Sequence, residues 1–68
     1  MTIADHDAYF RVCDALGKKP NESLIDAARR AMWRTRGRKR RAARIIAGPV
    51  DGWPSILQAD RVLRGVAP

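Results

Sequence analysis

Apolar residues in this chain repeat at the three- and four-residue spacing of a helix, and the two-residue alternation of strands does not recur. The first such run consists of Tyr9, Val12, Cys13 and Leu16. Thr2 followed by Asp5 is a suitable N-cap for it, and Gly17 is a C-terminal stop. The pattern predicts a first helix over about residues 3–16.

A second helical pattern follows a turn at Lys18–Asn21. Asn21 is a good N-cap, acids near the start and arginines toward the end suit the helix dipole, and the pattern covers about residues 22–35. Its apolar stripe is narrow and has small side chains, so another helix can approach it closely. The stripe consists of Leu24, Ala28, Ala31 and Thr35.

Gly37 marks the point at which this second helix is expected to bend. A helix continued past it would place Arg38 and Lys39 on the buried face. Gly37 itself would cost about 1 kcal/mol in a helix interior. We therefore predict a bend at about 36–38 and a short helix over about 39–47, and we expect Gly37→Ala to raise the helix content. One helix over 22–47 is the alternative.

A last helix is predicted after Gly48-Pro49 and a turn that includes Trp53, which we expect to cover the core. Ser55 with Gln58 makes a capping box, and the pattern runs over about 55–64. Its apolar face consists of Ile56, Ala59, Leu63 and Val66. The chain is thus expected to be one small all-α domain over residues 1–68, a bundle of three to four helices.

Catalysis is not expected, because 68 residues supply only a small core without room for a buried cleft. His6 and Cys13 are about 10.5 Å apart along a helix, too far for a nucleophile and its base. Cys13 is the only cysteine, which excludes an intramolecular disulfide and a cysteine-based zinc site in one chain. We predict no enzyme, no cofactor and no metal, and a cytoplasmic protein without a signal peptide or membrane span.

Charge is concentrated in the segment 29–44, which has nine basic residues and no acid, whereas the rest of the chain has five basic and seven acidic residues. Such an excess is typical of a protein that binds a polyanion. Trp33 lies off the apolar stripe at the edge of this segment, so it either contacts a partner or packs in the core. The candidate binding residues are Arg29, Arg30, Trp33, Arg34, Arg36, Arg38, Lys39, Arg40, Arg41 and Arg44.

Two functions fit the basic segment. In the first, a regulatory or accessory protein binds DNA or structured RNA, mainly through phosphates because no groove-reading motif is complete. In the second, a small modulator of phage or mobile-element type docks on an acidic surface of a larger protein or nucleoprotein. An anionic membrane is disfavoured, because the segment lacks a broad apolar face. A homodimer stays open, since small cores are often completed by association.

Overall fold

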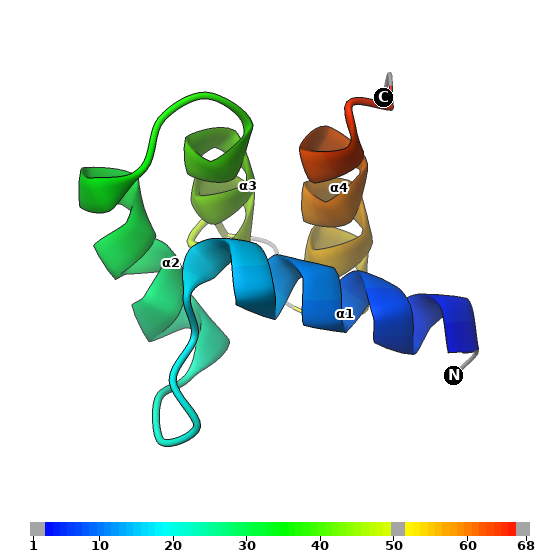
Figure 1. Cartoon of the computed structure of the whole chain (residues 1–68), viewed down its shortest axis with the longest axis horizontal. Coiled ribbons are helices and arrows are strands. Elements are labelled where there is room, and N and C mark those ends of the chain that lie inside the picture. The colour runs from blue at the N-terminus through cyan, green and yellow to red at the C-terminus, as the bar shows by residue number, and fades with distance from the viewer. Residues whose placement is uncertain (1–2, 50–51, 67–68) are drawn as a thin grey trace.

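The computed structural model describes residues 3–49 and 52–66, and these residues form four helices and no strand, which confirms the predicted all-α bundle. The helices are α1 (Ile3–Leu16), α2 (Leu24–Arg34), α3 (Arg38–Ile46) and α4 (Trp53–Arg64). α3 packs beside both α2 and α4, and α1 crosses these three helices (Figure 1). The bend predicted at Gly37 is confirmed, because residues 35–37 separate α2 from α3.

The core is built largely from alanine. Larger buried side chains come from Val12 and Leu16 of α1 and Ile46 of α3, and partly buried apolar residues pack around them. Because alanine ends at Cβ, the helix backbones approach closely where these residues meet. The buried alanines of this central cluster are Ala27, Ala28, Ala31, Ala42, Ala43 and Ala59.

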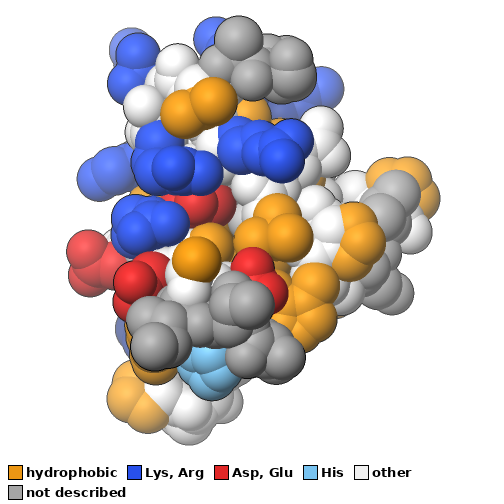
Figure 2. Space-filling model, turned by 90° about the vertical axis from the view of Figure 1, so that its right-hand side faces the viewer, with side chains coloured by type: hydrophobic (Ala, Val, Ile, Leu, Met, Phe, Trp, Pro, Cys, Tyr) orange, Lys and Arg blue, Asp and Glu red, His pale blue; other side chains and the backbone are white. Residues whose placement is uncertain are grey.

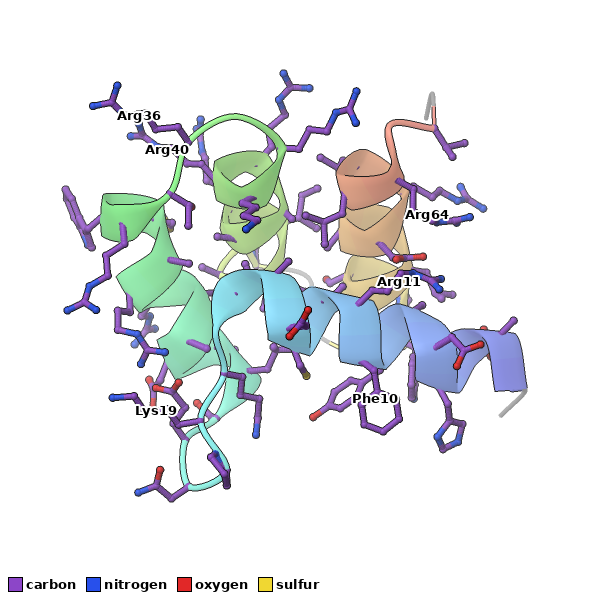
Figure 3. The ribbon with its side chains drawn as sticks, in the orientation of Figure 1. Phe10, Arg11, Lys19, Arg36, Arg40 and Arg64 are labelled. Atoms are coloured by element: carbon purple, nitrogen blue, oxygen red, sulfur yellow. The ribbon has the colours of Figure 1, made fainter. Side chains whose placement is uncertain are left out.

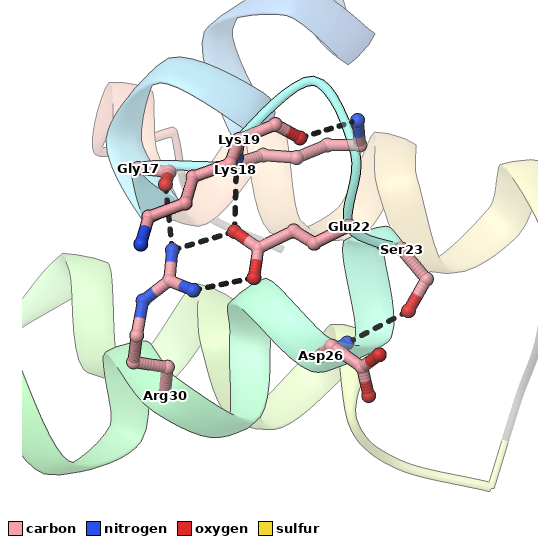
Figure 4. A network of polar contacts seen from close by, with 7 residues as sticks. All are labelled: Gly17, Lys18, Lys19, Glu22, Ser23, Asp26 and Arg30. Atoms are coloured by element: carbon pink, nitrogen blue, oxygen red, sulfur yellow. Dashed lines mark hydrogen bonds and ion pairs between the residues drawn. The ribbon is translucent and has the colours of Figure 1, made fainter.

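The start of α2 differs from the prediction. Asn21 does not cap the helix, and Ser23 does, with its Oγ accepting a hydrogen bond from the Asp26 amide at 3.1 Å. Glu22 lies before the helix, where it accepts a hydrogen bond from the Lys19 amide at 2.9 Å and pairs with Arg30 (Figure 4). Glu22 therefore ties the turn to α2 instead of serving as its first residue.

The start of α4 also differs from the prediction. The helix begins at Trp53 after Gly52, whose φ is +86°, and Pro54 lies in its first turn, where the missing amide hydrogen costs nothing. Ser55 is therefore a buried residue inside the helix and not its cap. Trp53 is half-buried, with its ring centroid 6.1 Å from that of Tyr9. The predicted N-cap Thr2 lies outside the described residues.

Val66, just beyond the end of α4, was predicted to lie on the apolar face of the helix, but it is exposed. Gly65 has φ +76°, and its left-handed conformation ends the helix. Val66 is consequently 48% exposed, whereas Ala59 on the predicted face is buried and Ile56 and Leu63 pack against the core.

Asp60 of α4 is a buried acid that the sequence pattern did not reveal. Its side chain is 2% exposed and accepts two hydrogen bonds from the Arg11 guanidinium, at 2.7 and 3.0 Å. Arg64, one turn further on, pairs with the same carboxylate at 2.9 Å. The hydrogen bonds from Arg11, followed by the charges of both arginines, lower the pKa of Asp60, so the buried carboxylate stays ionised and joins α1 to α4.

Candidate nucleic-acid interface

The basic segment folds as the end of α2, a short turn and the whole of α3. Thr35 ends α2: its amide donates to the Ala31 carbonyl at 2.9 Å, and its hydroxyl donates to the same oxygen at 2.6 Å. Gly37 then adopts φ +65° and ψ −132°, a conformation that residues other than glycine rarely adopt. The gain of helix content expected for Gly37→Ala therefore no longer follows, because alanine would be strained there.

Buried alanines decide which side chains face outward. α2 buries Ala27, Ala28 and Ala31. α3 buries Ala42, Ala43 and Ile46. Because these inner positions carry uncharged side chains, the basic residues between them project from the other faces, where water hydrates their charges. Eight of the nine predicted basic residues are exposed, namely Arg29, Arg34, Arg36, Arg38, Lys39, Arg40, Arg41 and Arg44.

We call these eight residues the basic face. Within residues 3–49 and 52–66, the ion pairs join Arg11 and Arg64 to Asp60 and Arg30 to Glu22, so none of the eight is paired with a described carboxylate. The basic face therefore has charge that the described part of the protein does not neutralise.

Arg30 differs from the other predicted site residues, because its guanidinium is paired within the protein. Its guanidinium donates to both carboxylate oxygens of Glu22 and, at 2.7 Å, to the Gly17 carbonyl (Figure 4). The hydrogen bonds from Arg30 to Glu22, followed by the one from the Lys19 amide, lower the pKa of Glu22 to about 2. Arg30 thus fixes the α1–α2 turn against α2.

Trp33 lies on the outer surface of α2. Its side chain is 86% exposed, which excludes the core position that the sequence left open. Arg29 precedes it by four residues, so the two share one face of the helix. An indole ring that is open to solvent beside exposed cations can stack on a planar partner group.

The first turn of α3 concentrates positive charge further. This turn contains no acid, and Gly37 provides no side-chain cap. Its residues are Arg38, Lys39, Arg40 and Arg41. A helix N-terminus carries about half a positive charge, so these cations are unfavourable neighbours until an anion approaches. Figure 3 shows Arg36 and Arg40 together where α2 gives way to α3, and Lys19 at the opposite end of the molecule.

The structure adds a residue that the sequence analysis missed. Arg38, Arg41 and Arg44 of α3 line a hollow between α3 and α4, and Arg61 of α4 lines it too. Lys and Arg side chains cover much of the upper half of the α4 side of the molecule (Figure 2). The basic surface thus extends beyond segment 29–44, and only the helix packing reveals this extension.

Comparison with known proteins finds no matching family model, no matching curated protein and no matching solved structure. In the described residues, no group of three or more His, Cys, Asp or Glu side chains is placed to hold a metal ion. None of the described helices is long and apolar enough to cross a membrane. The chemistry of the site is therefore read from its own side chains.

Proposed function

We propose that this chain is a small cytoplasmic nucleic-acid-binding protein with a regulatory or accessory role, which binds DNA or structured RNA through the basic face. The observation that carries the proposal is the group of eight exposed cations without a described carboxylate partner. A phosphate backbone would supply the missing negative charge, and guanidinium groups match phosphate oxygens in a bidentate geometry.

The arrangement favours phosphate contacts over base recognition. The cations are distributed over α2, the 35–37 turn and α3, so they can follow a backbone. They are mainly arginines on exposed surface, with Trp33 as the aromatic group among them. Contacts of this kind fix the position of a protein on nucleic acid and carry little sequence information.

A salt titration of duplex DNA binding, followed by fluorescence anisotropy, tests the proposal. Not all eight cations can face one backbone, and about five to seven phosphate contacts would give a slope of log K against log salt near −4 to −6. Changing Arg36 and Arg40 together to Gln should reduce the slope by up to about two and weaken binding to all sequences alike.

The matched control is the double change Lys18→Gln and Lys19→Gln. It removes the same charge from the turn at the opposite end of the molecule, and it should leave the slope unchanged (Figure 3). A slope near zero, or equal losses from the two double variants, would show that the basic face is not the binding surface.

A further inference from the structure

We propose that the groove between α3 and α4 binds an amphipathic helix of a protein partner, with an apolar stripe flanked by Asp and Glu. The groove shares Arg38, Arg41 and Arg44 with the basic face, but part of its lining is apolar, and we call that part its floor. Four aliphatic side chains contribute to that floor, and none of them is fully buried: Ile45, Leu57, Val62 and Val66.

The charged side chains that line the groove are all basic. Arg38, Arg41 and Arg44 come from α3 and Arg61 from α4, and no acid lines the groove among the described residues. Apolar side chains together with three arginines on α3 and one on α4 complement a helix with aliphatic residues at i, i+3, i+4 and i+7 and carboxylates beside them.

The dimensions of the groove suit a helix of about three turns. Its lining runs along α4 from Pro54 to Gly65, which at 1.5 Å per residue is about 16 Å. The hollow has a volume of about 1030 Å³. One end is formed by Arg38, since a Cβ built on Gly65 would lie only 2.9 Å from Arg38 Cζ. The absence of a side chain at Gly65 therefore lets the guanidinium lie against the end of α4.

The same features argue against nucleic acid as the occupant of this groove. Phosphates could bind the arginines but would leave the aliphatic floor uncovered, and nucleobases stack best on aromatic rings, which the described lining lacks. Gln58 is the amide among the lining residues, and the other polar groups that line the groove are the arginines. An acidic amphipathic helix satisfies both the floor and the arginines.

Fluorescence anisotropy with a labelled 15-residue peptide provides the test. The peptide is designed as a helix with leucines at i, i+3, i+4 and i+7 and glutamates on both flanks. A scrambled peptide of the same composition has no apolar stripe. We expect the designed peptide to bind at least ten times more tightly than the scrambled one. Equal affinities would show that charge alone drives binding, and no binding at low salt would also overturn the proposal.

Variants locate the peptide on the surface. Leu57→Gln and Val66→Gln should each weaken peptide binding about tenfold, with the fold checked by circular dichroism. Phe10→Gln changes another exposed apolar side chain, 63% exposed on α1, and should have no effect. Val66→Gln alters a residue beyond α4, so it keeps the test valid if Leu57→Gln fails to fold. Equal losses from Phe10→Gln and Val66→Gln would overturn the proposal.

Two further measurements distinguish the proposed helical partner from other occupants of the groove. Leu57→Gln should leave duplex DNA binding unchanged, whereas Arg36→Gln with Arg40→Gln should leave peptide binding unchanged, so the two proposals can fail independently. Loss of DNA binding in Leu57→Gln would assign the groove to nucleic acid. A dimer in analytical ultracentrifugation that Leu57→Gln dissociates would assign the groove to a second copy of the chain. Either result would overturn the proposed partner.

Discussion

Asp60 and Arg11 form a bidentate pair in which the carboxylate is 2% exposed and the guanidinium side chain is 46% exposed. The pair joins two helices that are distant in sequence. We expect Asp60→Asn to lower the free energy of unfolding by about 1–3 kcal/mol, because hydrogen bonds to a charged group are lost at a buried position. Urea denaturation measures this change.

Arg64→Gln is the comparison for that variant. It removes the second arginine from the Asp60 carboxylate, but Arg64 is 49% exposed and lies only four residues after Asp60 on the same helix. A loss of about 0–1 kcal/mol is expected, as for other exposed pairs. If Arg64→Gln costs as much as Asp60→Asn, then the link between α1 and α4 is not the source of the stability.

Acid should destabilise the protein in part through Glu22. The ionised carboxylate is favoured in the folded state, since its pKa falls from 4.5 to about 2 through Arg30 and the Lys19 amide. The contribution of Glu22 to the free energy of unfolding is therefore fully present above pH 4.5 and is lost as the pH falls through about 2. Asp60, with a lowered pKa, acts in the same direction.

Urea denaturation of the wild type and Glu22→Gln over this pH range isolates the Glu22 contribution. The two free energies of unfolding should differ most above pH 4.5 and converge toward pH 2. Parallel pH profiles would mean that the Glu22–Arg30 pair adds no stability in solution.

Gly37→Ala should destabilise the protein by about 1–3 kcal/mol. A Cβ at this position meets no atom within 4 Å, so the whole cost comes from the backbone conformation. D-Alanine gives an exact stereochemical control, because φ +65° and ψ −132° are the mirror image of a relaxed L-conformation. A synthetic chain with D-alanine at position 37 should be at least as stable as the wild type in thermal unfolding. Equal losses of stability from L-alanine and D-alanine would contradict a positive φ at position 37.

Trp33→Ala should weaken nucleic-acid binding without changing the salt slope, because an indole contributes stacking and not charge. Stacking on a base is worth about 1–3 kcal/mol, so the loss should be largest for single-stranded or looped RNA. Trp33→Phe should retain part of the affinity. Phe10→Ala is the matched control on α1, away from the basic face (Figure 3). Anisotropy titrations at several salt concentrations distinguish these effects, and a steeper or flatter slope in Trp33→Ala would refute this role.

The helices were predictable because their signals are local. The apolar spacing predicted α1. The cost of Gly37 inside a continuous helix predicted the break before α3. The caps were less predictable, since Asn21 and Ser23 are both good N-caps and Glu22, which lies between them, binds Arg30 eight residues away. A contact at that range is not visible in a local pattern.

The candidate site was predictable in composition but not in arrangement. Sequence alone indicated the basic residues, yet Arg30 is held by Glu22 and Arg61 joins from α4. Asp60 falls on the predicted apolar face of the last helix, four residues after Ile56 and three before Leu63, but the spacing does not show which arginine pairs with it. These three residues depend on how helices pack together, which the sequence pattern does not specify.

The alanine contacts between α2 and α3 have an evolutionary consequence. The residues that hold α3 in place are Ala42, Ala43 and Ile46, whereas its charged residues project from the other faces. Substitutions at the exposed positions can therefore alter the electrostatic surface without disturbing the scaffold. Surface mutations can therefore change the charge pattern over generations while the fold persists, whereas a larger side chain at Ala42 or Ala43 would push α3 away from its neighbours.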